Sequence, residues 1–305
     1  MKLLVTGGTG LIGSALVESL AERGDSITVL TRDITNAKKK LGRSNTKSVG
    51  FIESLSGLRD LNEFDGVINL AGEPVATRRW SDQQKQIIEN SRWNLTQKIS
   101  ELINASDDPP SVFLNGSAIG YYGVSDDQVL TEAFDQPKPD FGHRLCEMTE
   151  RLANESVSSH TRVCHLRTGV VLSRHGGALA RMRPAFALGF GSPIASGDQY
   201  MSWIHIDDMI SGLIHVLGSE DMSGPINFTA PNAIPNSEFS RALAKALKRP
   251  FFMPAIPEWF MKLAFGEMSE LLIHGQNAYP EALLQSGYQF AYPDIREALQ
   301  NIYSE

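Results

Sequence analysis

The sequence predicts an α/β protein with a doubly wound parallel sheet and a smaller C-terminal lobe. Apolar runs of strand length alternate with helix-patterned segments through roughly the first 175 residues, and glycines bound many of these runs. Beyond residue 173 the pattern changes to shorter, glycine-interrupted segments. Strands that alternate with helices in this way are typical of βαβ units, in which helices cover both faces of a parallel sheet.

The expected strands and helices divide the chain into two parts. Residues 1–173 are expected to form mainly one α/β domain, and residues 174–305 mainly a C-terminal lobe. Some segments of the lobe must return to the sheet, because no low-complexity linker separates the two parts. The expected strands lie within residues 2–7, 26–32, 65–72, 110–118 and 162–173.

The first turn of the chain carries three regularly spaced glycines. Gly7, Gly10 and Gly13 form G-x-x-G-x-x-G directly after an apolar strand and at the start of an amphipathic helix. Glycine lets the backbone turn tightly and approach a pyrophosphate, which the N–H groups of the helix N-terminus attract. The pattern predicts a Rossmann-type dinucleotide site. Its expected contacts are Gly7, Thr9, Gly10, Leu11, Ile12 and Gly13.

The end of the second strand indicates which dinucleotide binds. An NAD-binding protein usually offers a carboxylate to the adenosine ribose about twenty residues after the glycines. This strand ends instead with Thr31 and Arg32, and Asp33 follows. A guanidinium can hold a 2′-phosphate with two hydrogen bonds, so NADP(H) is favoured. The alternative is that Arg32 is solvated and Asp33 binds the ribose.

The expected strand at 65–72 ends in small residues that would let a cofactor lie across the sheet edge. Leu70, Ala71, Gly72 and Glu73 are its expected cofactor contacts. Core packing alone is the alternative for the first three.

Composition excludes several classes of function. The chain has 42% hydrophobic and 21% charged residues with a net charge of −7, which gives no basic surface for nucleic acid. No run is long enough to span a membrane, and the two cysteines have no metal-ligand spacing, so no metal site is expected. We expect a cytoplasmic protein with a small-molecule substrate. The oligomeric state stays open, with a homodimer as one alternative.

Several motifs together resemble the extended short-chain dehydrogenase/reductase superfamily. "TGGTGLIG", "DGVINLAG", "NGSA" and "WIHIDDM" match its cofactor loop, fourth strand, serine strand and a segment near the return of the substrate lobe. "NLAGEP", "RRW", "RTGVVL" and "SGYQFAYPDIREAL" resemble the NAD-dependent epimerase/dehydratase-like "epimerase family proteins" of its atypical subgroup. The resemblance implies an oxidoreductase or sugar-nucleotide epimerase-like activity, with Arg92 near the cofactor.

The resemblance also implies a catalytic serine and a Tyr-x-x-x-Lys pair. Ser117 matches the serine, but the helix expected within 139–155 contains neither tyrosine nor lysine. If Glu150 is the family's glutamate, Gly142 and Cys146 stand in the tyrosine and lysine places. A register shifted by two gives Asp140 and Arg144 instead. No register restores the pair.

Three interpretations follow from the missing pair. Tyr122, or less favourably Tyr121, supplies the hydroxyl beside Ser117; these two tyrosines face opposite ways if they lie on a strand. Alternatively, an acid such as Glu73 or a histidine such as His143 or His205 acts. Otherwise the protein binds NADP(H) without turnover.

Three further residues have competing structural interpretations. His143 is expected to be an exposed helix residue, and Asp207 to cap the helix that follows it. Arg167 either reaches a substrate phosphate or holds the sheet edge, with no preference from sequence. The leading hypothesis is an NADP(H)-dependent oxidoreductase or epimerase-like enzyme whose substrate is anionic or a nucleotide sugar.

Overall fold

The computed structural model describes residues 1–41, 48–125, 127–158 and 160–304. Its centre is a seven-stranded sheet in the order β11-β7-β5-β4-β1-β2-β3, in which every neighbouring pair is parallel. The predicted α/β class with a doubly wound parallel sheet is confirmed. The strands are β1 (Lys2–Thr6), β2 (Ser26–Leu30), β3 (Val49–Ile52), β4 (Gly66–Asn69), β5 (Val112–Ala118), β7 (Arg162–Thr168) and β11 (Gly224–Phe228).

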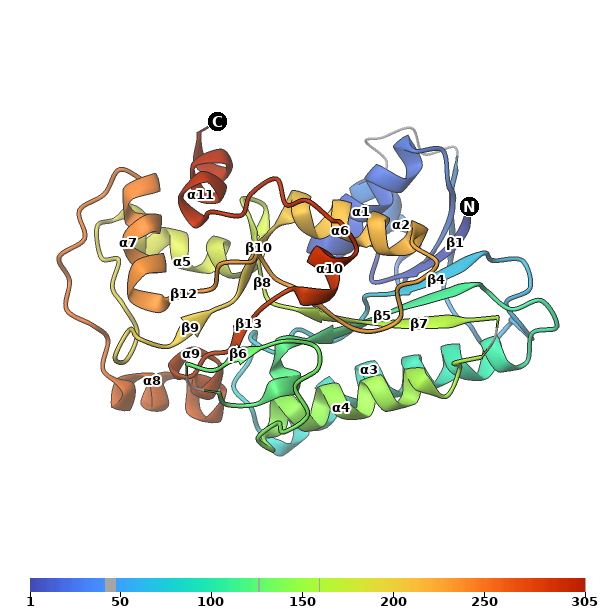
Figure 1. Cartoon of the computed structure of the whole chain (residues 1–305), viewed down its shortest axis with the longest axis horizontal. Helices are drawn as coiled ribbons and strands as arrows, with labels where there is room; N and C mark the ends of the chain where they lie inside the picture. The colour runs from blue at the N-terminus through green and yellow to red at the C-terminus, as the bar shows by residue number, and fades with distance from the viewer. Residues whose placement is uncertain (42–47, 126, 159, 305) are drawn as a thin grey trace.

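Helices cover both faces of this sheet, as its buried strands require. Helices α3 (Asp82–Asn104) and α4 (Phe141–Asn154) lie side by side on one face, and α1 (Leu11–Glu22) and α6 (Ile206–Gly218) on the other (Figure 1). Alternate residues of β1 serve the two cores: Leu3 and Val5 pack with α1 and α6, and Leu4 packs with α3 and α4. Helix α2 (Ile34–Leu41) packs beside α1.

The C-terminal lobe is built from short strand pairs and short helices around a second core. Parallel β8 (Val170–Ser173) and β10 (Trp203–His205) lead into it, and antiparallel β9 (Tyr200–Met201) and β12 (Ile234–Pro235) extend it. Leu172, Trp203 and Phe239 belong to its core. Its helices are α5 (Gly177–Ala187), α7 (Asn236–Ala246), α8 (Glu258–Phe265), α9 (Glu270–Ile273) and α11 (Ile295–Tyr303), with a 3₁₀ turn η3 (Gly266–Ser269).

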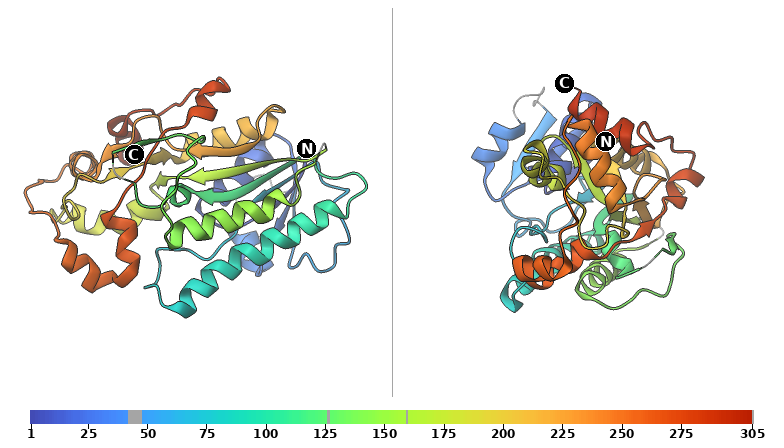
Figure 2. Two further views of the ribbon diagram at one scale, coloured as in Figure 1. Left: turned by 60° about the horizontal axis from the view of Figure 1, so that its bottom comes forward. Right: turned by 90° about the vertical axis from the view of Figure 1, so that its left-hand side faces the viewer.

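The C-terminal segment crosses between the lobe and the sheet more than once. Strand β11 joins the edge of the sheet beside β7, and β13 (Asn277–Ala278) later pairs with β6 (Val129–Leu130). Helix α10 (Glu281–Gln285) then packs against β11, and α11 returns to α7 in the lobe (Figure 2). Among the described residues, no helix is long and apolar enough to cross a membrane.

Candidate functional site

The glycine-rich turn lies between β1 and α1, as the sequence predicts. Gly7 has a φ of 68° and its carbonyl accepts a hydrogen bond from Gly10 N at 2.9 Å. A Cβ at Gly13 would lie 2.2 Å from that carbonyl oxygen, so only glycine permits this packing of α1 on the turn. Helix α1 has no side-chain cap and no acidic residue in its first turn. Its N-terminus is therefore suited to an anion.

A cavity of about 870 Å³ opens beside this turn at the carboxyl ends of β1, β2 and β4. In an open α/β sheet, this edge is where the strand order reverses and where ligands bind. Of the predicted contacts, Leu11, Ile12, Gly13 and Arg92 are not part of its lining. The predicted contacts that do line it are Gly7, Thr9, Gly10, Thr31, Arg32, Leu70, Ala71, Gly72 and Glu73.

Arg32 and Asp33 occupy different surroundings at the end of β2. The Asp33 Oδ1 atom accepts a hydrogen bond from Asn36 N at 2.9 Å and so caps the start of α2. Arg32 lines the cavity and forms no hydrogen bond or ion pair with any described residue. Farther along α2, Lys40 Nζ reaches Thr9 O at 3.3 Å. The Arg32 guanidinium at the cavity is therefore without a partner among the described residues, whereas one carboxylate oxygen of Asp33 caps α2.

Small residues after β4 bring the chain against the glycine turn. Ala71 N donates to Thr6 Oγ1 at 3.2 Å, and a Cβ at Gly7 would come within 2.6 Å of the Leu70 backbone. A Cβ at Gly72 would lie 2.7 Å from the Arg92 guanidinium carbon. These close approaches form the cavity wall and bring α3 to it through Arg92.

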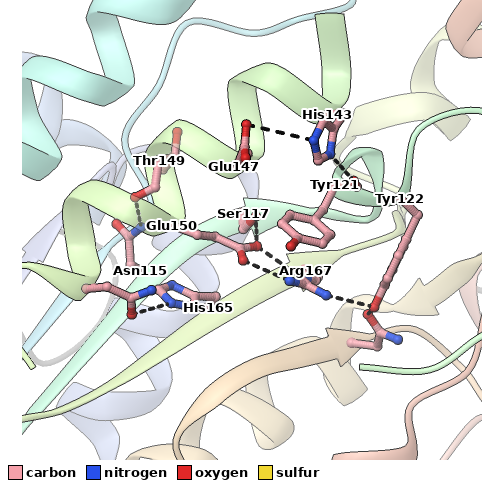
Figure 3. Close-up of polar contacts among 12 residues, drawn as sticks. Asn115, Ser117, Tyr121, Tyr122, His143, Glu147, Thr149, Glu150, His165 and Arg167 are labelled. Carbon is pink, nitrogen blue, oxygen red and sulfur yellow. Dashed lines mark hydrogen bonds and ion pairs between the residues drawn. The ribbon is translucent and has the colours of Figure 1, made fainter. Parts of the chain in front are cut away.

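Ser117, near the end of β5, belongs to a buried charged cluster (Figure 3). Its hydroxyl donates to Glu150 Oε1 at 2.7 Å. Arg167 donates to the same carboxylate twice, from Nε and Nη2, at 2.9 Å each. Burial lowers the pKa of Arg167, but hydrogen bonding to Glu150 and its charge more than offset this and raise it overall. Arg167 therefore stays protonated in the core.

Tyr122 lies in the core, whereas Tyr121 lies over the charged cluster. Tyr122 is 1% exposed; its hydroxyl donates to Asn227 Oδ1 at 2.8 Å and accepts from Arg167 Nη1 at 3.2 Å. Burial raises the pKa of Tyr122 to about 12. The ring of half-buried Tyr121 stacks on the Arg167 guanidinium, 3.4 Å from its Cζ atom. The Tyr121 hydroxyl forms no hydrogen bond with any described residue.

The expectation that both tyrosines lie on a strand is wrong. They belong to a short 3₁₀ helix, η2 (Ile119–Tyr122), because β5 ends at Ala118. Gly120 in this turn packs on Gly142 at the start of α4, where a Cβ on either residue would lie 3.7 Å from the other's Cα. The turn η2 thus packs closely against the start of α4 at these two glycines.

The expectation for His143 is also wrong. His143 is buried in α4, and its Nδ1 lies 2.6 Å from Tyr121 O, so it holds η2 in place.

Asp207 does not cap α6 either. His205 is the N-cap, and its Nδ1 accepts a hydrogen bond from Asp207 N at 3.1 Å. Burial lowers the pKa of His205, so its neutral form, which can accept that bond, is favoured.

Cys146 lies on α4 one turn before Glu150. Cys146 is buried, and burial and the charge of Glu150 raise the pKa of its thiol to about 11, although the Ser117 hydroxyl and the charge of Arg92 act in the opposite direction. The Cys146 thiol is therefore a weak nucleophile at neutral pH.

Sequence reasoning missed the role of Glu150 and left that of Arg167 open. Glu150 served only to set the register of α4, and Arg167 had two competing roles. Ionisable residues inside otherwise apolar strands are seldom buried unless they are paired. Arg167 within "RVCHLRT" could therefore have indicated a buried carboxylate partner on the neighbouring helix.

Comparisons with known proteins identify the family. The model of the NAD dependent epimerase/dehydratase family matches residues 3–228, and that of a Domain of unknown function (DUF1731) matches residues 256–302. An Arabidopsis thaliana protein, "Epimerase family protein SDR39U1 homolog, chloroplastic", is 34% identical over 99% of this chain and 86% of its own length. The Bacillus subtilis epimerase family protein YfhF is 32% identical over 100% of this chain and 99% of its own length.

Solved structures agree with this fold. The crystal structure of the human epimerase family protein SDR39U1 (isoform 2) with NADPH is 32% identical, with a TM-score of 0.90 and full coverage of both chains. A UDP-glucuronic acid 4-epimerase from Bacillus cereus, in complex with UDP-glucuronic acid and NAD, covers this chain fully and 98% of its own with a TM-score of 0.77. At 19% identity, that likeness concerns the fold alone.

Proposed function

The chain belongs to the NAD dependent epimerase/dehydratase family, and from this premise we propose that it is an NADP(H)-dependent oxidoreductase or epimerase-like enzyme. The observation that carries the proposal is the position of Arg32. It lines the 870 Å³ cavity beside the glycine turn without a hydrogen-bonding or ionic partner among the described residues, while an Asp33 oxygen caps α2. A 2′-phosphate is the group that such a guanidinium recognises.

The residues around the cavity fit a dinucleotide. Gly7 and Gly13 keep the turn free of side chains, and the uncapped start of α1 offers backbone N–H groups to a pyrophosphate. Thr31 and the segment from Leu70 to Glu73 supply the walls. When bound, NADP(H) supplies or accepts a hydride at its nicotinamide ring. A human relative whose structure contains NADPH supports this cofactor for the present chain.

Ser117 is proposed to bind the reacting oxygen of the substrate. Its only proton is directed to Glu150, which leaves its lone pairs to accept a hydrogen bond. A substrate carbinol satisfies this requirement because its hydroxyl group is a donor, whereas a carbonyl substrate would require the Ser117 hydroxyl to turn from Glu150 and donate to the carbonyl oxygen. Ser117 would therefore orient an alcohol substrate, and the Glu150–Arg167 pair would hold Ser117 in that orientation.

Tyr121 is the better candidate for moving the proton of that oxygen. Tyr122 is held in the core by Asn227 and Arg167, and its pKa of about 12 makes proton loss difficult. Tyr121 is half-buried, and its hydroxyl is not committed to any described residue. We therefore assign proton transfer to Tyr121 with Ser117 and give Tyr122 a structural role. The proposed substrate is a small carbinol or carbonyl compound. Anionic compounds and nucleotide sugars are the first candidates to test.

The second candidate is a protein that binds NADP(H) without turning it over. It is favoured by Cys146, which stands where the resemblance implies a lysine. Stopped-flow absorbance on NADPH-loaded protein, with a panel of sugar nucleotides and small carbonyls, separates the two. Oxidation that Ser117→Ala abolishes supports the enzyme. Tight binding of NADPH without oxidation across the panel supports the second candidate.

A further inference from the structure

Arg92 is a partly buried cation that lacks a carboxylate partner among the described residues. It lies on α3, and its Nη1 atom donates to Glu73 O at 2.8 Å and to Ile88 O at 3.4 Å. Burial lowers the pKa of Arg92, whereas the charges of Cys146 and Glu73 act in the opposite direction. Its Nε and Nη2 donors have no hydrogen-bonding partner in the described chain. A buried guanidinium in this state favours a ligand that offers acceptor oxygens.

The side chain of Arg92 lies between the cavity and Ser117. On one side it touches Gly72, which lines the cavity, and a Cβ there would be 2.9 Å from its Nη1 atom. On the other side, α3 packs on α4: Trp93 Nε1, next to Arg92, donates to Leu145 O, next to Cys146, at 3.3 Å. One turn farther along α4, Glu150 accepts the hydrogen bond from Ser117. A ligand that extends from the cavity toward Ser117 must therefore pass Arg92.

The face of α4 that carries Cys146 has no cationic side chain. Gly142, Cys146 and Glu150 are spaced four residues apart, so they share one face of the helix. Glu150 on this face is already neutralised by Arg167, and position 146 carries a small uncharged thiol. Arg92 lies on the neighbouring helix α3, next to Trp93, whose Nε1 donates to Leu145 O beside Cys146.

We propose that Arg92 is the cation that binds the ribose of the nicotinamide half of NADP(H), in place of a lysine at position 146. The inference rests on the proposed function, because it needs the cofactor to extend from the cavity to Ser117. Its free N–H donors would hold the ribose hydroxyls, and its anchors on Glu73 and Ile88 would fix its position. Arg92 and Ser117 thus come from different elements, α3 and β5, and both elements pack against α4.

The experiment compares binding of the whole cofactor with binding of its adenosine half. NADPH affinity is measured by fluorescence titration, and adenosine 2′,5′-bisphosphate affinity by competition. Arg92→Met keeps most of the side-chain volume and removes the donors. We expect it to weaken NADPH binding by about tenfold, the usual effect of losing a charge-assisted hydrogen bond, and to change the bisphosphate affinity by less than about twofold.

Two further variants sharpen the result. Arg144→Met removes an exposed cation of α4 that pairs with Glu89 and should leave both affinities unchanged. The double variant Arg92→Ala, Cys146→Lys should recover much of the NADPH affinity, because it returns a cation to the same place from α4. Unchanged NADPH binding by Arg92→Met, or an equal loss for both ligands, would overturn the inference, as would a folded double variant without recovery. If the wild-type protein binds no NADPH, the proposed function itself fails.

Discussion

Glu150 and Arg167 form a buried ion pair with two hydrogen bonds of 2.9 Å each between α4 and β7. Their side chains are 8% and 4% exposed. Ser117 Oγ lies 2.7 Å from the Oε1 atom that also accepts from Arg167 Nε. The pair therefore fixes the serine proton at the site, and it links the stability of the core to the geometry of the proposed chemistry.

Glu150→Gln should destabilise the protein strongly. It removes the negative charge and leaves Arg167 buried without an ionic partner, which lowers the free energy of unfolding by about 3–5 kcal/mol. Urea denaturation followed by tryptophan fluorescence measures the loss. Glu147→Gln is the matched control, because Glu147 is an exposed residue of the same helix. A loss below about 1 kcal/mol for Glu150→Gln would show that the pair contributes little.

The two tyrosines should separate activity from stability. Tyr122→Phe leaves Asn227 Oδ1 and Arg167 Nη1 short of a buried partner and should lower the free energy of unfolding by about 1–3 kcal/mol. Tyr121→Phe should keep stability and reduce NADPH oxidation by about a hundredfold or more. Denaturation and single-turnover rates on both variants are the measurements. The opposite pattern would return the proton-transfer role to Tyr122.

Arg32→Ser should change cofactor preference rather than general affinity. The guanidinium lines the cavity and has no competing partner among the described residues, so its loss removes the proposed bond to the 2′-phosphate. We expect NADPH binding to weaken by about tenfold to a hundredfold while NADH binding stays the same. Fluorescence titrations with both cofactors give the ratio, and Arg59→Ser, an exposed position, is the control. Wild-type protein that binds NADH as tightly as NADPH would refute the role of Arg32.

Gly13→Ala should abolish dinucleotide binding. The added Cβ would meet Gly7 O at 2.2 Å, so the turn or the start of α1 must move. Gly218→Ala is the control, because a Cβ there meets no atom within 4 Å. Isothermal titration with NADPH should give no measurable binding for the first variant and wild-type affinity for the second. Retained binding by Gly13→Ala would mean that the turn adapts and does not itself hold the cofactor.

Glu132 should make stability depend on pH. Its Oε1 atom accepts hydrogen bonds from Asn227 N and Ala282 N, and its Oε2 atom is buried without a partner among the described residues. Burial raises the pKa of Glu132. The folded state therefore binds this proton more tightly than the unfolded state does, and the contribution to stability is lost as pH rises through the folded-state pKa.

Glu132→Gln removes this dependence. The free energy of unfolding of the wild type should fall relative to the variant in the pH range above the ordinary glutamate pKa of about 4.5. Urea denaturation of both proteins across this range measures the difference, and Glu220→Gln at an exposed position should show no such trend. A difference that stays constant with pH would contradict the assignment.

The sequence was sufficient for the sheet and for the glycine-rich turn at its edge because their signals are local. Gly13 follows a strand and opens a helix, and Arg32 ends the next strand, so each can be located without knowing the rest of the fold. Because β1 and β2 are parallel neighbours, the residues that follow each strand lie at the same edge of the sheet. The resemblance to epimerase-family proteins is confirmed by the family match over residues 3–228.

The surroundings of Ser117 could not be predicted in the same way. The contact between Glu150 and Arg167 depends on how α4 packs on β7. The position of η2 likewise depends on how it packs against the start of α4, where Gly120 lies beside Gly142. Neither leaves a periodic pattern in the sequence. The sequence also offered no physical ground for choosing between Tyr122 and Tyr121: on a strand the two side chains differ only in the side they face, whereas in η2 the Tyr122 hydroxyl is buried in a hydrogen-bonded core.

The proposed function requires that the protein transfer hydride between NADP(H) and a carbinol or carbonyl substrate. The most direct measurement uses NADPH deuterated at the nicotinamide C4 position, incubated with the protein and a small-molecule cell extract, and detects deuterium in products by mass spectrometry. We expect at least one deuterated product with the wild-type protein and none with Ser117→Ala. Tight NADPH binding with no deuterium in any extract compound would contradict it.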